Sequence, residues 1–229
     1  MRSFDYIESG KTLLTPHTTS LLAAIHEAKG RQSIQTTIRP DILGTLVAVA
    51  RIQSTDASNR IEGISTSDSR LNDLVSEKVT PRNRNEEEIA GYRDALSVIH
   101  ESHDYIPITP NVILQLHRDL FRHTPLTFAG HFKDSDNVII ERDAHGTSTV
   151  RFAPPSALVT PELIERACSA YTQAIRDGHT DPLLAIAMFI LDFICIHPFN
   201  DGNGRMSWLL TLLMLYRNGY MVGKYITIE

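Results

Sequence analysis

Several features are scarce or missing in this 229-residue sequence, and each absence narrows the class of protein. There are only two cysteines, Cys168 and Cys195, and both lie in apolar helical patterns, so we expect reduced, buried thiols and no disulfide framework. The longest apolar run falls short of the roughly 18 residues of a membrane span, and the N-terminus lacks the apolar core of a signal peptide. We therefore expect a cytoplasmic protein without a membrane segment.

Basic stretches and the common nucleotide-binding motifs are also missing. The formal net charge is −5, and Arg82 and Arg84 are followed at once by three glutamates, which argues against direct nucleic-acid binding. No Gly-x-x-x-x-Gly-Lys-Ser/Thr occurs, and no Gly-x-Gly-x-x-Gly follows a strand pattern. Apolar residues make up 42% of the chain and charged residues 21%, which is typical of a globular protein with a sizeable core.

The most informative stretch is a short polar loop between two apolar runs. Residues 183–196 are almost unbroken hydrophobe, interrupted only by Asp192, and residues 206–216 form a second apolar run. Both runs are long enough for helices of three to four turns and too apolar for surface helices. The loop between them, residues 197–205, reads His-Pro-Phe-Asn-Asp-Gly-Asn-Gly-Arg.

The glycines of this loop predict an anion site. Gly202 and Gly204 flank Asn203, so the backbone can adopt left-handed conformations that direct several N–H groups into one concavity. The second helix is expected to begin near Gly204, and its N-terminus adds unpaired N–H groups and partial positive charge. Arg205 supplies a planar guanidinium suited to phosphate oxygens.

Two further loop residues carry chemistry. Asp201 is an oxygen ligand beside the predicted phosphate site, which suits a Mg²⁺ ion that also binds phosphate. His197 is the group in the loop whose side chain ordinarily titrates near neutrality, so it is the candidate general base.

The loop closely resembles the central motif of the Fic family, His-x-Phe-x-(Asp/Glu)-Gly-Asn-Gly-Arg-x-x-Arg, over nine consecutive positions. The resemblance implies an all-α, Fido-type helical bundle with a small β-hairpin flap. It also implies a protein adenylyltransferase that moves AMP from Mg·ATP to a Ser, Thr or Tyr hydroxyl of a target protein. In this reading His197 is the catalytic base, Asp201 holds Mg²⁺ and Phe199 anchors the loop in the core, while Gly202, Asn203, Gly204 and Arg205 bind phosphate.

One position departs from the family motif. The second arginine of the motif is replaced by Trp208, which lies three residues after Arg205 on the same predicted helix face. In the family this arginine contacts the γ-phosphate in the active state and an inhibitory glutamate in the silent state. An indole has no charge and one donor, so we expect weaker ATP binding and a weaker hold of the inhibitory glutamate.

An upstream segment resembles the inhibitory helix of autoinhibited Fic proteins that carry it N-terminal to the core. Residues 54–63 contain Ser58, Glu62 and Gly63 in the pattern Ser-x-x-x-Glu-Gly. Ser58 and Glu62 share a helix face, and Gly63 fits the position after a helix C-terminus. The alternative is an ordinary exposed helix end. The resemblance implies that Glu62 enters the nucleotide site and blocks the productive position of ATP.

The rest of the chain alternates between helical patterns and one hairpin. Helices are expected over 20–28 (ended by Gly30), 41–53, 86–103, 111–121 and 161–176, with Asn218-Gly219 ending the second buried helix. Residues 65–78 are expected to form a short helix or a loop. His117 is expected to be a hydrogen-bonded core residue, and His100 with His103 to be solvated rather than a metal site. A first arm over 130–133 and 137–140, a turn over 143–146 and a returning arm over 147–152 predict the hairpin.

In the family the flap (about residues 130–152) holds the target segment by main-chain pairing. The predicted docking residues are Lys133, Asp134, Ser135, Asn137 and Val138. A structural hairpin without a partner is the alternative reading.

We divide the chain at the polar break around residues 81–85, into an N-terminal helical region (1–84) and a Fic core (85–229). A homodimer and a C-terminal segment beyond Glu229 are further expectations. Two alternative functions stay open: a nucleotide-binding regulatory protein with little activity, and a hydrolase that removes AMP from a modified protein, in which Glu62 would position water.

Overall fold

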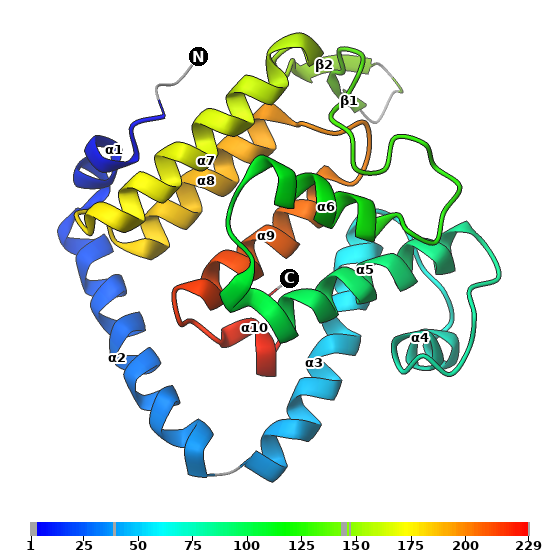
Figure 1. Cartoon of the computed structure of the whole chain (residues 1–229), viewed down its shortest axis with the longest axis horizontal. Helices are drawn as coiled ribbons and strands as arrows, with labels where there is room; N and C mark the ends of the chain where they lie inside the picture. The colour runs from blue at the N-terminus through cyan, green and yellow to red at the C-terminus, as the bar shows by residue number, and fades with distance from the viewer. Residues whose placement is uncertain (1–3, 39, 143–145, 147, 229) are drawn as a thin grey trace.

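The computed structural model describes residues 4–38, 40–142, 146 and 148–228, and it is almost entirely helical (Figure 1). The all-α fold class with one small hairpin is therefore confirmed. The helices are α1 (Tyr6–Leu13), α2 (Pro16–Ile38), α3 (Pro40–Ile61), α4 (Asp68–Val75), α5 (Arg84–Ser102), α6 (Pro110–Leu120), α7 (Thr160–Asp177), α8 (Pro182–Ile196), α9 (Asn203–Arg217) and α10 (Val222–Tyr225). Short 3₁₀ helices follow α5 (His103–Tyr105) and precede α7 (Ala157–Val159).

The N-terminal helices lie around the core, and α1 contributes the buried side chain of Tyr6 to it. α1 lies against α7 and α8, α2 runs away from them, and α3 returns to pack on α5, α9 and α10 (Figure 1). The helix expected over residues 20–28 was predicted to end at Gly30, which is wrong because α2 continues to Ile38. A single glycine lowers helix stability by only about 1 kcal/mol, which does not suffice to end a helix. α1 had no predicted counterpart, although Asp5 caps it by accepting the Glu8 N–H at 2.9 Å.

α3 is one continuous helix that includes the polar residues 54–61. It ends in a Schellman motif, in which the Gly63 N–H donates to the Arg60 carbonyl at 3.0 Å and the Ile64 N–H to the Asn59 carbonyl at 2.9 Å. Gly63 has a φ of +75°, as this motif requires, so its predicted place just past the helix end is confirmed.

The two apolar runs form α8 and α9, which pack against each other. α9 is buried along most of its length, but α8 exposes Leu191 and Ile194, so the expectation that both helices are too apolar for the surface is wrong for α8. Asp181 caps α8 by accepting the Leu183 N–H at 2.9 Å, and Pro182 stands where a helix needs no N–H. Both helices contribute to one core with α5, α6 and α7, to which Phe193, Phe199 and Met206 add fully buried side chains. α9 ends as predicted at Asn218-Gly219, with Gly219 at a φ of +77°. None of the described helices combines the length and apolar character needed to cross a membrane.

The hairpin consists of β1 (Ile139–Arg142) and β2 (Ser148–Phe152), paired antiparallel with an irregularity between Ile139 and Ile140. The expected strand segment over 130–133 is wrong, because these residues form a turn and a loop before β1. Most of its predicted turn, residues 143–145, lies outside the described residues. Every residue of β2 is exposed. The hairpin therefore stands at the surface, as a two-stranded sheet without a second layer must.

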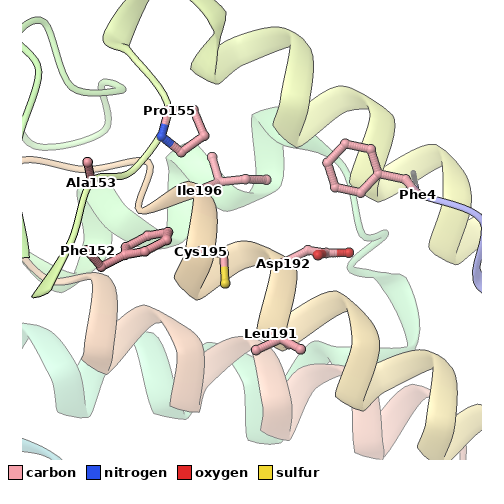
Figure 2. A pocket seen from close by; sticks show the side chains of 8 residues that line it. All are labelled: Phe4, Phe152, Ala153, Pro155, Leu191, Asp192, Cys195 and Ile196. Carbon is pink, nitrogen blue, oxygen red and sulfur yellow. The ribbon is translucent and has the colours of Figure 1, made fainter. Parts of the chain in front are cut away.

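An apolar cavity of about 440 Å³ lies between the end of β2 and the last turns of α8 (Figure 2). Phe152, Leu191 and Ile196 line it, together with Cys195. Cys195 is only partly buried, so the expectation of two buried thiols is wrong for this residue; it holds for Cys168, where burial raises the pKa to about 12. Both thiols are free.

His117 of α6 joins this helix to the loop that follows α8. Its ring stacks on Phe199, with ring centroids 3.7 Å apart and planes 1° apart. Nδ1 accepts the Gly130 N–H at 2.9 Å, so Nε2 carries the proton that it donates to the Asp201 carbonyl at 3.1 Å. The expectation of a hydrogen-bonded core histidine is confirmed.

Close packing of α5 on α6 makes a first prediction. A methyl group on Gly91 would collide with the backbone carbonyl of Leu120, which cannot move away as a side chain could. We expect Gly91→Ala to lower the free energy of unfolding by roughly 1–3 kcal/mol. Gly30→Ala is the matched control: a methyl group there meets nothing within 4 Å, and we expect a gain of about 0.5–1 kcal/mol. Urea unfolding measures both, and equal stabilities would contradict the packing.

The neutral state of His117 makes a second prediction. Burial, with a smaller effect of the Arg205 charge, lowers the pKa of His117 to about 4. In the unfolded chain His117 binds a proton near pH 6.5, whereas in the folded chain it does so only near pH 4. The contribution of the neutral ring to folding stability is therefore complete above pH 6.5 and is lost as the pH falls toward 4. We expect it to amount to at most about 3 kcal/mol. In His117→Phe, stability should be lower at pH 7 and should fall less between pH 6.5 and 4. Urea unfolding at several pH values tests this, with His179→Phe as the control for the substitution type; an unchanged slope would contradict it.

Candidate functional site

The polar loop between α8 and α9 is bounded by two left-handed residues. His197 ends α8 with a φ of +50°, and its N–H donates to the Phe193 carbonyl at 3.0 Å. Gly202 precedes α9 with a φ of +81°. A side chain at Gly202 would also meet the Phe121 ring at 2.9 Å, so both conformation and space require glycine there.

Phe199 and Asn203 hold the loop in place. Phe199 is fully buried between His117 and the core, and the Asn203 side chain grips its backbone, accepting the Phe199 N–H at 3.0 Å and donating to its carbonyl at 2.8 Å. The amide of Asn203 is therefore used inside the protein. Its backbone N–H, in the first turn of α9, belongs to the group that a helix leaves unpaired.

The imidazole of His197 is partly buried at the end of α8. Burial is the main cause that lowers its pKa, and the positive charge of Lys133 acts in the same direction. The ring is therefore neutral at pH 7, the state that a general base needs.

Lys133 is buried beneath the loop instead of facing outward with the other predicted docking residues. Its Nζ donates to the Ile196 carbonyl at 3.2 Å and to Asn137 Oδ1 at 3.0 Å, and its N–H donates to the Pro198 carbonyl at 2.8 Å. Burial lowers the pKa of this ammonium. Lys133 thus ties the segment before β1 to both sides of His197.

The other predicted docking residues lie at the rim of the loop. Asp134, Ser135 and Val138 are exposed, and Asn137 is partly buried. Asn200 donates to Asp134 at 3.3 Å, so the segment before the hairpin and the loop contact each other through side chains as well as backbone.

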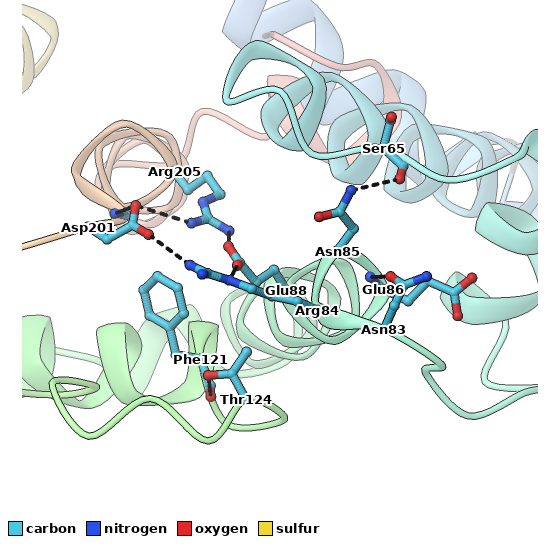
Figure 3. A network of polar contacts seen from close by, with 11 residues as sticks. Ser65, Asn83, Arg84, Asn85, Glu86, Glu88, Phe121, Thr124, Asp201 and Arg205 are labelled. Carbon is cyan, nitrogen blue, oxygen red and sulfur yellow. Dashed lines mark hydrogen bonds and ion pairs between the residues drawn. The ribbon is translucent and has the colours of Figure 1, made fainter.

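Four charged residues form a network beside the start of α9 (Figure 3). Arg205 is 1% exposed; its Nη1 donates to Glu88 Oε2 at 2.7 Å, and its guanidinium lies 5.0 Å from the centre of the Phe121 ring. Arg84 donates from Nε to Glu88 Oε1 at 2.8 Å. The carboxylate of Asp201 lies 3.7 Å from Arg205 Nη2 and 3.6 Å from Arg84 Nη2.

Glu88 and Arg84 were not predicted as site residues. The glutamates at 86–88 read as the favourable acidic first turn of a helix, but Glu86 and Glu88 are both buried. Glu86 pairs with Arg70, which lowers the pKa of the Glu86 carboxyl to about 2. The fold shows that the predicted polar break around residues 81–85 places the guanidinium of Arg84 beside Asp201 of the loop.

The end of α3 lies over the start of α9. A methyl group built on Gly204 would collide with Glu62 Oε1, and the Glu62 carboxyl carbon would be 3.2 Å away. Within the described residues this carboxylate has no ion pair. Ser58, one turn earlier, is buried and donates to Tyr92 Oη at 2.7 Å, which fixes α3 against α5. Gly63 completes the helix end and does not touch the loop in any described contact.

Trp208 lies one turn beyond Gly204 on α9 and is partly buried. Its indole N–H makes no hydrogen bond to any residue that the structure describes. The position therefore offers no charge to Glu62 or to a ligand.

The donor set suits a metal ion that is shared with a ligand rather than held by protein alone. Among the described residues, no three His, Cys, Asp or Glu side chains are placed to enclose a metal ion. The Asp201 carboxylate is 43% exposed beside the amide end of α9. One exposed carboxylate next to a phosphate site is the usual protein contribution to a bound Mg²⁺–phosphate complex.

Comparison with known proteins agrees with this geometry. Residues 107–215 match the Fic/DOC family. A Fido domain-containing protein of Dictyostelium discoideum is 36% identical over 90 residues, which is 38% of this chain and 58% of that protein. Protein adenylyltransferase fic-1 of Caenorhabditis elegans is 28% identical over 145 residues, which is 60% of this chain and 25% of that protein. The chain thus spans between a quarter and somewhat over half the length of these relatives.

Solved structures share the fold. A Fic domain-containing signaling protein from Bacteroides thetaiotaomicron superposes with a TM-score of 0.73 at 24% identity, covering 86% of this chain and 73% of that one. A Fic family protein from Desulfovibrio desulfuricans gives a TM-score of 0.72 at 24% identity, covering 93% of this chain and 61% of that one. With the loop motif placed between α8 and α9 in this fold, residues 107–215 of the chain are a Fic/DOC family domain.

Proposed function

We propose that this protein transfers AMP from Mg·ATP to a hydroxyl side chain of another protein. One observation carries the proposal: a neutral imidazole, His197, lies five residues before the amide end of α9, with an exposed carboxylate, Asp201, between them. The names of relatives, among them protein adenylyltransferase fic-1, support the same activity at the level of the family.

The proposed step is an in-line displacement at the α-phosphorus. The hydroxyl oxygen of the target forms the new bond to phosphorus while His197 accepts the hydroxyl proton. The bond between the α-phosphorus and the bridging oxygen breaks, and pyrophosphate leaves with its electron pair. The N–H groups at the start of α9 stabilise the charge that grows on the phosphate oxygens. Asp201 would hold the Mg²⁺ of the nucleotide complex, which offsets phosphate charge.

The phosphate-binding roles divide between backbone and side chains. Asn203 and Gly204 supply backbone N–H groups, and the side chain of Asn203 keeps them in place through Phe199. The N–H of Gly202, also predicted to bind phosphate, donates to Asp201 Oδ1 at 2.6 Å, so Gly202 contributes through its left-handed backbone. Arg205 is almost fully buried against Glu88, so it supports the site by orienting Asp201 and by its positive charge beneath the loop.

The hairpin is the proposed docking element for the target protein. β1 and β2 form a two-stranded sheet with exposed side chains such as Ile140 and Val150, and Val138 just before β1 is exposed as well. An extended target segment would add a strand, and main-chain hydrogen bonds would hold it whatever its sequence. Lys133 would contribute by fixing the base of the hairpin segment to the loop.

We also propose that α3 inhibits the nucleotide site. Glu62 occupies the space beside Gly204, where a phosphate would approach the helix N-terminus. The proposed inhibitory region lies within residues 1–84 and the core within 85–229, and Ser58 docks the first on the second through Tyr92.

Two substitutions test catalysis and inhibition together. We expect Glu62→Gly to raise labelling of protein by radioactive or mass-tagged ATP, because a negative charge leaves the phosphate site, and His197→Ala in the same background to abolish it. Mass spectrometry of the product identifies the added AMP. If Glu62→Gly instead abolishes hydrolytic removal of AMP from a modified protein, the chain is the hydrolase. If no variant is labelled, a regulatory nucleotide-binding protein is the better description.

Trp208→Arg tests the departure from the family motif. A restored guanidinium should add a charge-assisted hydrogen bond to phosphate of roughly 1.5–3 kcal/mol, which corresponds to about 10- to 150-fold higher affinity for Mg·ATP. Trp208→Gln adds polarity without charge and serves as the control. Isothermal titration with Mg·ATP measures both variants, and equal affinities of Trp208→Arg and the unmodified chain would refute the expectation.

A further inference from the structure

The cations beside Asp201 differ sharply in their access to a ligand. Two described guanidinium groups lie within 4 Å of its carboxylate, those of Arg205 and Arg84. The side chain of Arg205 is 1% exposed and is already paired with Glu88, whereas the side chain of Arg84 is 61% exposed. A molecule that enters the site from solvent can therefore reach Arg84 and not Arg205.

Glu88 holds Arg84 in position through one hydrogen bond and leaves most of its N–H donors available. Arg84 stands in the first turn of α5, and Glu88, one turn later and 3% exposed, accepts its Nε–H at 2.8 Å (Figure 3). Because the other oxygen of Glu88 accepts from Arg205, this carboxylate fixes two guanidinium groups on either side of Asp201. An arginine has five N–H donors, so most of those on Arg84 stay available at the solvent side.

Arg84 is also near the amide end of α9. The Asp201 carboxylate that it approaches at 3.6 Å accepts the Gly202 N–H at 2.6 Å through its other oxygen. The guanidinium is thus separated from the first N–H of the phosphate site by a single carboxylate. A chain of two or three phosphates that begins at the start of α9 extends over a comparable span.

We propose that Arg84 is a nucleotide-binding residue that contacts the phosphates beyond the α-phosphate. The inference rests on the proposed function, since it assigns a role within the same nucleotide site. Trp208 adds no cation on α9 and the guanidinium of Arg205 is buried, so Arg84 supplies the exposed cation from α5. A planar fork of donors suits oxygens of a terminal phosphate, and it stabilises the charge of departing pyrophosphate.

A structural role for Arg84 would have a different signature. A partly exposed pair at positions i and i+4 of a helix contributes only about 0.3–0.5 kcal/mol to stability, and its loss would affect every ligand alike. Phosphate contact beyond the α-position predicts a loss that depends on the number of phosphates in the nucleotide.

The test compares Arg84→Gln with Arg82→Gln, each in the Glu62→Gly background, which opens the site. Arg82 is exposed and lies two residues before Arg84, so the control removes the same charge from the same segment. Isothermal titration with Mg·ATP, ADP and AMP gives three affinities for each variant, and circular dichroism verifies the helical content.

We expect Arg84→Gln to weaken Mg·ATP binding about tenfold or more and AMP binding less than about twofold. Arg82→Gln should change each affinity less than about twofold, and Arg84→Lys, which keeps the charge, should lose less than Arg84→Gln. Trp208→Arg should restore part of the loss.

Two outcomes overturn the proposal and can be told apart. If Mg·ATP binds and Arg84→Gln binds it equally well, or loses ATP and AMP affinity by the same factor, Arg84 does not contact the outer phosphates and the proposed function stands. If neither the parent nor any variant binds these nucleotides, the proposed function fails and the role of Arg84 fails with it.

Discussion

The stacking of His117 on Phe199 is the contact on which the site depends. Phe199 is the one apolar side chain of the loop that reaches the core, and a neutral histidine covers its ring face to face. Both ring nitrogens of His117 bond to backbone groups, one at Gly130 before the hairpin and one at Asp201 in the loop. The stack therefore also sets the distance between these two segments. Asn203 then binds the backbone of Phe199 from the α9 side. The five loop residues 198–202 are thus fixed by the ring of Phe199 and by the side chains of His117 and Asn203. All three side chains make their contacts inside the protein.

Charge is arranged around this loop in layers. Glu88 is buried and binds two arginines, so the negative charge that it adds inside is more than compensated. The arginines in turn flank Asp201, whose carboxylate is partly open to solvent, and Arg84 is the most exposed member of the network. Lys133 adds a buried positive charge at the other end of the loop, next to His197. The network of two arginines and two carboxylates is formally neutral, so the added positive charge beside the loop is that of Lys133.

Much of this arrangement could be read from the sequence, and the limits have physical causes. Local patterns predicted α5 to α9 closely, because apolar periodicity and capping residues such as Asp181 and Gly219 act within a few residues. The loop motif predicted the members of the site because they are consecutive. Arg84 and Glu88 could not be found in this way, since Glu88 contacts Arg205 and Arg84 lies beside Asp201, each more than a hundred positions away. The continuation of α2 through Gly30 was missed because propensity penalises a glycine without excluding it. The burial of Lys133 was missed for a related reason: a charged residue in a polar stretch reads as exposed, and only the fold supplies the two oxygens that bind its ammonium.

The backbone of His197 has a consequence for how the protein changes under selection. A left-handed conformation costs a non-glycine residue on the order of 1 kcal/mol, and this histidine adopts it with a φ of +50°. Glycine would relax the backbone, but it would remove the imidazole. Selection for folding stability alone therefore favours glycine at position 197. Selection that keeps the histidine retains the imidazole and accepts this cost in folding free energy.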